Sequence, residues 1–543
     1  MHSFLLKIAA FLRRRYFLSC PAGVFNLCFA LLVLAVYNQT FFTKIHELSG
    51  SSLFTFLTFV CFAALFNMAA ALLFFKYSLK VLTILILCVN AAVYDFMTTY
   101  NIAVDKIMLL NVLETDAKEI ADLVNWHSAG IFFCFGLLPS YLVYKIRVIY
   151  RPFVRELFVR ALIVLLSAGI AGGLIFCDFK NVAQFARNNR DVKYYLLPVN
   201  YIGAVISAVK IKLRSNHPLV KIGEDARMHF HRQENGKKNL IVLVVGETAR
   251  AANFSLNGYA RDTNAPLQKY LPDLINYPHV SACGTSTAVS VPCMFSAGGR
   301  KTFDAGRASY TENVLDIMQR AGYKVWWREN NSGCKGVCSR VETEELCFGD
   351  GYCPDMNLRQ GLADKLAADF RDTVVVLHQQ GSHGPAYYLR YSGESARYLP
   401  ACETERFDKC RREEIVNAYD NTIYETSRFL AALMADLQRL GGKYNPILIY
   451  VSDHGESLGE NGIYLHAAPY VIAPKEQVNV PFLLWLPDET AAALQIDRDC
   501  LQKHAGDVYS HDNLFHSLLG FGAVQTSLYQ PELDIFAQCR KSE

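Results

Sequence analysis

The chain contains 543 residues, 52% of them hydrophobic, and carries a formal net charge of +4 at pH 7. This length predicts more than one domain, and the small net charge gives no electrostatic reason to expect a nucleic-acid partner. The long apolar runs fall mostly before residue 180, so we expect a membrane domain followed by a domain of more ordinary composition.

Five apolar runs in the first 180 residues are long enough, or nearly so, to cross a bilayer, which takes about 20 residues. Five such runs so close together disfavour helices buried in a soluble protein, and the scarcity of charges within them argues against a transport pathway. We predict a transmembrane domain over residues 1–180 with these spans: Gly23–Phe42, Leu53–Phe75, Leu79–Met97, Ser128–Tyr144 and Phe158–Cys177.

Lys and Arg are concentrated in alternate loops, which sets the orientation because basic loops stay in the cytoplasm. Arg13–Arg15 precede the first span, Lys76 and Lys80 follow the second, and four more basic residues lie between the fourth and fifth spans. The N-terminus is therefore predicted inside and the chain after the fifth span outside. The first span has no clear cleavage site, so we interpret it as an uncleaved anchor.

Cysteine usage independently predicts an exported C-terminal half. Ten of the 16 cysteines follow residue 282, and eight of these fall into close pairs. Such pairs are typical of disulfides in an oxidising compartment, and their spacings fit no standard zinc-finger pattern. The predicted disulfides are Cys283–Cys293, Cys334–Cys338, Cys347–Cys353 and Cys402–Cys410, with Cys500 and Cys539 remaining as a fifth pair.

Two segments at the membrane boundary have their own signals. The loop Tyr100–His127, outside in this topology, contains the polar stretch 111–119. Residues 181–238 are predicted to form an interfacial helix and a linker. Tyr194–Arg214 is apolar and aromatic with basic residues at one end, which is typical of a helix lying along a membrane surface, and residues 215–238 are polar.

The pattern changes at Asn239, and we predict a catalytic domain over residues 239–543. Short apolar runs predict strands buried on both faces, typical of a parallel sheet: Leu240–Val245, Thr373–Leu377, Ile447–Val451 and Pro481–Leu486. Helical patterns lie between them, including Glu312–Ala321 and Glu414–Leu440. Alternating strands and helices predict an α/β sandwich, in which ligands bind beyond the carboxyl ends of the strands.

Several side chains that could bind a metal follow these strand ends. Asp453-His454 is a plausible two-ligand unit, Glu247 could supply a third ligand, and carboxylate and imidazole donors suit zinc. Thr287, in the hydroxyl-rich stretch Ala282–Cys293, could occupy the fourth position as a nucleophile. Other polar residues near these motifs could assist: His383 and His466 as proton donors, second-metal ligands or phosphate contacts, and Asn331 and Lys335 as anion contacts.

Each of these residues also has a structural interpretation. Glu247 could be a helix cap, His466 an ordinary surface histidine, and Lys335 a solvated loop charge. Even the hydroxyl-rich stretch could be a surface loop closed by a disulfide. The joint placement of these residues favours the site.

Five motifs, in order along the chain, resemble those of the lipid A phosphoethanolamine transferases of Gram-negative bacteria, the family of the EptA and mobile colistin resistance enzymes. They are Val245-Gly-Glu-Thr-Ala-Arg250, Cys283-Gly-Thr-Ser-Thr-Ala288 with Pro292-Cys293, Asn330-Asn-Ser-Gly-Cys-Lys-Gly336, Gly381-Ser-His-Gly-Pro-Ala386 and Ser452-Asp-His-Gly-Glu-Ser457. The resemblance covers nearly the whole chain. It implies a five-helix transmembrane domain and a periplasmic α/β sandwich of the alkaline-phosphatase/sulfatase type.

The resemblance also implies roles at the matching positions. Thr287 matches the nucleophile, and Glu247, Asp453 and His454 with Thr287 match the ligands of one tightly bound Zn²⁺. Whether a second zinc binds during turnover stays open. The implied substrate-binding residues are His383, His466, Asn331, Ser332, Lys335, Asn111, Thr115 and Glu119.

The implied reaction moves phosphoethanolamine from phosphatidylethanolamine to a lipid A phosphate through a covalent phospho-threonine. The protein would be a monomer that crosses the bacterial inner membrane several times, with its catalytic domain in the periplasm. The added ammonium would weaken the binding of cationic peptides such as polymyxin.

Other functions stay open on the residues alone. They are a phosphoethanolamine or phosphoglycerol transferase acting on core oligosaccharide, glycan or protein, a periplasmic phosphodiesterase, and a membrane scaffold with a binding ectodomain. A sulfatase would carry a Cys/Ser-x-Pro-x-Arg motif, which the hydroxyl-rich stretch lacks.

Overall fold

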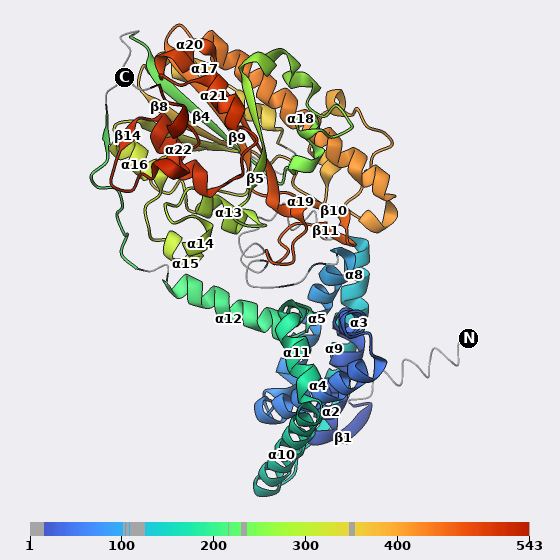
Figure 1. Ribbon diagram of the computed structural model, residues 1–543. Helices are drawn as coiled ribbons and strands as arrows, with labels where there is room; N and C mark the ends of the chain where they lie inside the picture. Colours follow the sequence, from blue (N-terminus) through green and yellow to red (C-terminus); the bar gives the residue numbers. More distant parts are fainter. Residues whose placement is uncertain are drawn as a thin grey trace. The chain divides into compact units, whose positions relative to one another are not determined.

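The structure is a computed structural model that describes residues 16–100, 102, 104, 108, 125–214, 217–229, 236–346 and 353–541 (Figure 1). The predicted substrate residues Asn111, Thr115 and Glu119, and the predicted disulfide partner Cys347, lie outside the described residues. Within these residues the chain forms two compact units. The first contains the described residues up to 104 and those from 125 to 204, and the second contains Met108 and the described residues from 205 onward.

The first unit consists mainly of apolar helices, with one parallel pair of short strands, β1 (Leu18–Pro21) and β2 (Ile146–Ile149). Four helical stretches in the described residues are long and apolar enough to cross a membrane: α4 (Ser52–Leu73), α5 (Leu79–Tyr100), α8–α9 (Trp126–Lys145) and α10 (Phe153–Cys177). A fifth candidate is the bent pair Ala22–Tyr37 and Gln39–Ser49, which contains α2 (Ala22–Leu32) and α3 (Gln39–Ser49). The chain is therefore a multi-pass membrane protein.

The first span differs from its predicted form because it bends by 68° at Asn38. The Asn38 side chain is fully buried and forms hydrogen bonds with Leu197, 159 residues later in the chain. Its Nδ2 donates to the carbonyls of Val33 at 3.0 Å and Leu197 at 2.9 Å, and its Oδ1 accepts from Leu197 N–H at 2.8 Å. These bonds satisfy the Val33 carbonyl beside the break and both backbone polar groups of the buried Leu197, as buried polar groups require.

Three helical segments follow the last span. They are α11 (Phe179–Asn188), a 3₁₀ helix (Arg190–Tyr195) and α12 (Val199–Arg214). The helix predicted over Tyr194–Arg214 thus begins five residues later than expected. The cause is the preceding segment: Leu196 is extended, Leu196 and Leu197 are both buried, and the Leu197 N–H donates to Asn38 Oδ1.

The second unit is built on an eight-stranded sheet with the order β13-β5-β12-β9-β4-β8-β6-β7. The strands are β4 (Lys238–Gly246), β5 (Leu274–Ser281), β6 (Lys324–Glu329), β7 (Glu342–Glu345), β8 (Thr373–His378), β9 (Tyr444–Ser452), β12 (Asn479–Trp485) and β13 (Tyr509–Ser510). β4, β6, β7, β8 and β9 are mutually parallel.

The prediction of a parallel arrangement was wrong for the strand at Pro481–Leu486. This strand, β12, runs antiparallel to both β9 and β5. After β9 the chain forms only the hairpin β10 (Ser457–Glu460) and β11 (Ile463–Leu465) and the short helix α19 (Lys475–Val478). Because no helix crosses back over the sheet, as a parallel connection requires, the chain returns beside β9 in the opposite direction.

Helices cover both faces of this sheet (Figure 1). On one face, Ile241, Leu243 and Val245 of β4 belong to a buried cluster that includes residues of α13 (Thr287–Met294), α16 (Val314–Arg320) and α22 (Asp512–Phe521). The 28-residue helix α18 (Arg412–Arg439) packs outside this cluster, against β9 and the sheet's other side. The arrangement is the predicted α/β sandwich.

Disulfides occur only in the second unit among the described residues. The bonded pairs are Cys283–Cys293, Cys334–Cys338, Cys402–Cys410 and Cys500–Cys539, with Cα–Cα distances of 5.4 to 6.1 Å. All six cysteines of the first unit are free thiols. This division is what an oxidising environment around the second unit predicts.

Candidate active site

The site forms at the carboxyl ends of the central parallel strands. β4 and β9 are neighbours with Gly246 opposite Ser452, so the next residues, Glu247 and Asp453, emerge side by side. Ligand atoms of Glu247, Asp453 and His454 all lie within 4.8 Å of one another. All three side chains are completely buried. The Glu247 carboxylate lies beside Thr287 and His454 and does not cap the 3₁₀ helix that follows, so the interpretation as a helix cap does not apply.

Thr287 is the first residue of α13 and faces this cluster. Its Oγ1 lies 3.2 and 3.1 Å from the two carboxylate oxygens of Glu247 and 3.3 Å from His454 Nε2. Its side chain is 5% exposed, so the stretch Ala282–Cys293 is not a solvated surface loop. The structure therefore places a hydroxyl among three groups that can bind a metal or accept a proton.

Hydrogen bonds orient the two ligand candidates from β9. His454 Nδ1 lies 2.9 Å from the Gly455 carbonyl, and because a carbonyl only accepts, Nδ1 carries a proton and Nε2 is the ring nitrogen that faces the two carboxylates. Asp453 Oδ1 accepts from Thr248 N–H and His454 N–H, at 3.1 and 2.7 Å. Asp453 Oδ2 is buried and has no hydrogen-bond partner.

Negative charge is concentrated in this buried space. Burial and the neighbouring charge of Glu247 raise the pKa of Asp453 to about 7. Burial opposes the ionisation of Glu247, but the hydrogen bond and charge of His454 outweigh it and hold its pKa well below the usual value. Burial lowers the pKa of His454, yet the charges of Asp453 and Glu247 raise it to about 10. The cluster therefore attracts a proton or a cation.

The residues fit a divalent metal ion. Two carboxylates, one imidazole nitrogen and one hydroxyl form a nitrogen and oxygen donor set of the kind that zinc accepts. Asp453 Oδ2, which accepts no hydrogen bond, lies 3.3 Å from His454 Nε2, and both atoms could bind a metal ion once Nε2 gives up its proton. A cation would also offset the charge that the two buried carboxylates hold.

Backbone packing fixes Glu247 from behind. Gly381, beyond β8, has a φ of +50°, and a Cβ at this position would lie 2.6 Å from the Glu247 carbonyl oxygen and 3.0 Å from its nitrogen. Ser382 N–H donates to the same carbonyl at 3.0 Å. A glycine is required here both for the conformation and for the close approach.

Asn331 contacts Glu247 directly. Its Nδ2 lies 2.9 Å from Glu247 Oε2, 2.8 Å from the Gln379 carbonyl and 3.2 Å from His378 Nε2. Lys335 lies further along this loop, and its Nζ donates to the carbonyl of Ser332 at 3.0 Å and to its hydroxyl at 3.2 Å. Lys335 therefore bonds within its loop and is not simply a solvated charge.

Two further histidines lie on the other side of His454. The ring of His466 is 4.6 Å from that of His454 and 5.3 Å from that of His383, measured between centroids. His466 is 7% exposed, so it is not a surface histidine. Burial, with the nearby charge of His454, lowers its pKa to about 3. The imidazole of His466 is therefore neutral beside the cluster at neutral pH.

Sequence reasoning missed several residues that support the site. His378 ends β8, is fully buried, and lies 3.2 Å from Glu329 Oε2 through Nδ1. Ser290 on α13 donates to the Asp453 carbonyl in a close contact. The only available signal was the position of His378 at the end of a predicted strand. Ser290 lies within the hydroxyl-rich stretch, but nothing there distinguishes it from its neighbours.

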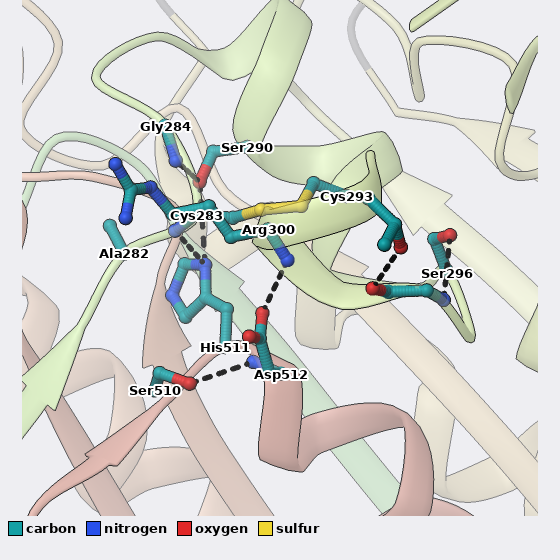
Figure 2. Close-up of a disulfide and its surroundings, with 12 residues drawn as sticks. Ala282, Cys283, Gly284, Ser290, Cys293, Ser296, Arg300, Ser510, His511 and Asp512 are labelled. Atoms are coloured by element: carbon teal, nitrogen blue, oxygen red, sulfur yellow. Dashed lines mark hydrogen bonds between the residues drawn. A yellow bond between two sulfur atoms is a disulfide. The ribbon is translucent and has the colours of Figure 1, made fainter. Parts of the chain in front are cut away.

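The disulfide Cys283–Cys293 encloses the segment that carries Thr287. Cys293 lies on α13, and the bridge joins this helix to the loop after β5 (Figure 2). Thr285 in the same loop is tied to another segment, since Ala467 N–H donates to its carbonyl at 2.6 Å and its Oγ1 donates to the Ala468 carbonyl at 2.7 Å. The loop around Thr287 is therefore held at several points.

Comparison with known proteins agrees with this architecture. Residues 239–522 match the sulfatase family, and residues 62–213 match the family described as phosphoethanolamine transferase EptA/EptB. The chain is 37% identical to phosphoethanolamine transferase EptA of Salmonella typhimurium over 95% of this chain and 96% of the relative. It is 36% identical to phosphatidylethanolamine transferase Mcr-1 of Escherichia coli over 85% of this chain and 89% of that protein.

A solved structure resembles the chain over almost its full length. It is the integral membrane lipooligosaccharide phosphoethanolamine transferase A (EptA) from Neisseria meningitidis, with a TM-score of 0.92 and 37% identity. The match covers 97% of this chain and 100% of the other. Both units of the chain therefore have counterparts in one known integral membrane protein.

Proposed function

Because the chain belongs to the phosphoethanolamine transferase family of EptA and Mcr-1, we propose that it transfers phosphoethanolamine from phosphatidylethanolamine to a lipid A phosphate through a covalent intermediate on Thr287. The observation that carries the proposal is the position of Thr287 Oγ1. It is buried, 3.1 to 3.3 Å from the Glu247 carboxylate and His454 Nε2, in a loop closed by a disulfide.

We assign one tightly bound zinc ion to Glu247, Asp453, His454 and Thr287. The assignment is supported by the donor set, by Asp453 Oδ2, which is buried and accepts no hydrogen bond, and by the two buried carboxylates. When bound, zinc stabilises negative charge on phosphoryl oxygens and lowers the pKa of a coordinated hydroxyl. A second zinc bound during turnover would appear as two zinc ions per chain in elemental analysis of the working enzyme.

The proposed reaction has two displacements at phosphorus. In the first, Thr287 Oγ1 bonds to the phosphorus of the donor, the bond from phosphorus to the glycerol oxygen breaks, and diacylglycerol leaves with the proton that the hydroxyl gives up. In the second, an oxygen of the acceptor phosphate bonds to phosphorus, the bond to Thr287 breaks, and the threonine regains a proton from the acceptor. Dividing the transfer lets one site serve two lipids in turn.

The remaining polar residues are proposed to handle the substrates. Asn331, Ser332 and Lys335 lie on one loop beside Glu247 and could hold the phosphoethanolamine group with fixed donors. His383 and His466, close to His454, could contact the phosphate and supply protons. Three positions of the loop before the fourth span are proposed to approach the bound lipid: Asn111, Thr115 and Glu119.

Membrane attachment and cysteine usage support the rest of the proposal. A multi-pass protein can hold the donor and the acceptor in the bilayer where both are anchored. The distribution of basic residues and the disulfides of the second unit favour the bacterial inner membrane with residues 239–543 in the periplasm. The interfacial segment and linker over 181–238 would connect this catalytic domain to the spans of residues 1–180.

The test uses full-length protein and a fluorescent phosphatidylethanolamine. Thr287→Ala should abolish release of fluorescent diacylglycerol, because no oxygen remains to form the intermediate. Thr285→Ala is the matched control. It removes a buried hydroxyl two residues away that donates to the Ala468 carbonyl and makes no hydrogen bond to Glu247, Asp453 or His454 in the described structure, so its loss of activity should be milder. Full activity of Thr287→Ala would refute the mechanism.

The acceptor needs a separate measurement. Mass spectrometry of lipid A from cells with and without the chain should show an added phosphoethanolamine group only with the active chain. If lipid A is unmodified and core sugar, glycan or protein carries the added group, the proposed acceptor is wrong but the proposed transfer reaction still holds. Release of free phosphoethanolamine alone would identify a phosphodiesterase.

A further inference from the structure

His511 is a buried histidine that the mechanism above does not use. It lies at the start of α22, is 2% exposed, and its imidazole contacts three segments around the site. Cys283 N–H donates to its Nδ1 at 3.1 Å, and Ser290 Oγ lies 3.3 Å from the same nitrogen (Figure 2). On the other side of the ring, Nε2 lies 2.9 Å from the Ser452 carbonyl oxygen.

These partners fix the state of the ring. A backbone N–H can only donate, so Nδ1 must accept from Cys283, and a carbonyl can only accept, so Nε2 must donate to Ser452. Only the neutral tautomer protonated at Nε2 satisfies both bonds. Both ring nitrogens are therefore occupied by backbone groups, which suits His511 to a positioning role and leaves it no nitrogen for substrate.

The two backbone partners belong to the two halves of the site. Cys283 begins the disulfide-closed loop that carries Thr287, and Ser452 directly precedes Asp453-His454. Ser290, on the helix that Thr287 begins, makes a second link because its hydroxyl donates to the Asp453 carbonyl. The imidazole thus spans from the nucleophile loop to the strand end that carries two ligand candidates.

The sheet itself holds His511 in place. Its own N–H donates to the Ser281 carbonyl at 2.9 Å, and the preceding Ser510 pairs with Ser281 where β13 joins β5. Because strands are more rigid than loops, a histidine bonded to a strand can hold the Thr287 loop in one position more precisely than a loop residue could.

We propose that His511 is a positioning residue for the transfer reaction, and that its two ring nitrogens hold the Thr287 loop at a fixed distance from the Asp453-His454 segment. The inference rests on the proposed function, because this distance matters only if Thr287 is the nucleophile. A misplacement of about 1 Å can lower an enzymatic rate about 100-fold. Since both ring nitrogens of His511 are bonded to backbone groups, neither is free to bind substrate, and the effect should appear in kcat and not in KM.

Three substitutions separate the two bonds. His511→Asn places an amide oxygen near the position of Nδ1 and removes the bond to Ser452. His511→Gln places an amide NH₂ near the position of Nε2 and removes the bond to Cys283. His511→Phe removes both. We expect kcat to fall about tenfold in each amide variant and about 100-fold in His511→Phe, with KM for the donor within about twofold of the parent.

The matched control is His516→Asn. His516 lies on the same helix, is 1% exposed, and its Nδ1 accepts a backbone N–H, that of Gln530, at 3.2 Å. It contacts neither Cys283 nor Ser452 in the hydrogen bonds of the structure. His516→Asn should therefore lower the thermal midpoint about as much as His511→Asn, while kcat stays within about twofold of the parent.

All variants are compared as full-length protein in detergent, by kcat, KM, thermal midpoint and zinc per chain. The inference predicts that the amide variants keep about one zinc per chain while kcat falls. It is overturned if kcat of the folded amide variants matches the parent, if zinc is lost in proportion to activity, or if KM rises instead. These variants decide the matter even where His511→Phe does not fold. Transfer activity in the Thr287→Ala protein would refute the proposed function. If Thr287→Ala is inactive but the His511 variants keep the kcat of the parent, only the inference about His511 is refuted.

Discussion

Gly381→Ala should weaken metal binding although it changes no proposed ligand. The new Cβ would lie 2.6 Å from the Glu247 carbonyl oxygen, 3.0 Å from its nitrogen and 3.1 Å from its Cβ. The first two atoms are backbone and cannot rotate away, so the end of β4 must shift. Because Glu247 directly follows β4, its carboxylate would move away from Asp453 and His454.

Two costs add at this position. An alanine in the left-handed region costs about 1–2 kcal/mol, and forcing a methyl group into a filled space costs about 1–3 kcal/mol. We therefore expect the free energy of unfolding of the second unit to fall by about 2–5 kcal/mol. Residues that orient a metal ligand typically change metal affinity 10- to 100-fold when mutated, and we expect a loss of that size.

Gly361→Ala is the control that measures the cost of an alanine in the left-handed region alone. Gly361 also has a left-handed backbone, with φ +65°, but nothing lies within 4 Å of the position of its Cβ. Thermal midpoints by scanning fluorimetry, zinc per chain after dialysis against a weak chelator, and transfer rates would be compared for both variants. Gly361→Ala should lose only stability. If Gly381→Ala kept zinc and activity as well as Gly361→Ala does, the reasoning about Glu247 would be refuted.

Two further predictions concern the ligands and the first membrane span. His454→Ala should lose both zinc and activity, whereas His466→Ala should lower turnover but keep about one zinc per chain; the opposite pattern by elemental analysis would overturn the ligand assignment. Asn38→Ala should destabilise the first unit by about 1–3 kcal/mol, because the N–H and carbonyl of Leu197 lose a buried partner. An unchanged thermal midpoint of the Asn38→Ala protein would refute this stabilising role of Asn38.

Local patterns in the sequence were enough to predict the two-part architecture. Hydropathy indicated the membrane helices because a span must satisfy its backbone internally and face lipid with apolar side chains. Runs such as Leu240–Val245 and Ile447–Val451 indicated buried strands, and both lie within observed strands. Ligands bind beyond the carboxyl ends of parallel strands, and this rule alone predicted that Glu247 and Asp453-His454 lie close together. Their roles as metal ligands remain a prediction.

Tertiary structure decided the features that depend on partners far away in the chain. The bend of the first span is fixed by a bond from Asn38 to Leu197, 159 residues later, and no local pattern predicts that partner. The antiparallel course of β12 followed from the short connection after β9. His511 meets Cys283 across 228 residues, and its role could not be inferred from its neighbours in the sequence. Periodicity reports which face of an element is buried, whereas the identity of a buried polar group's partner is set only when distant segments pack.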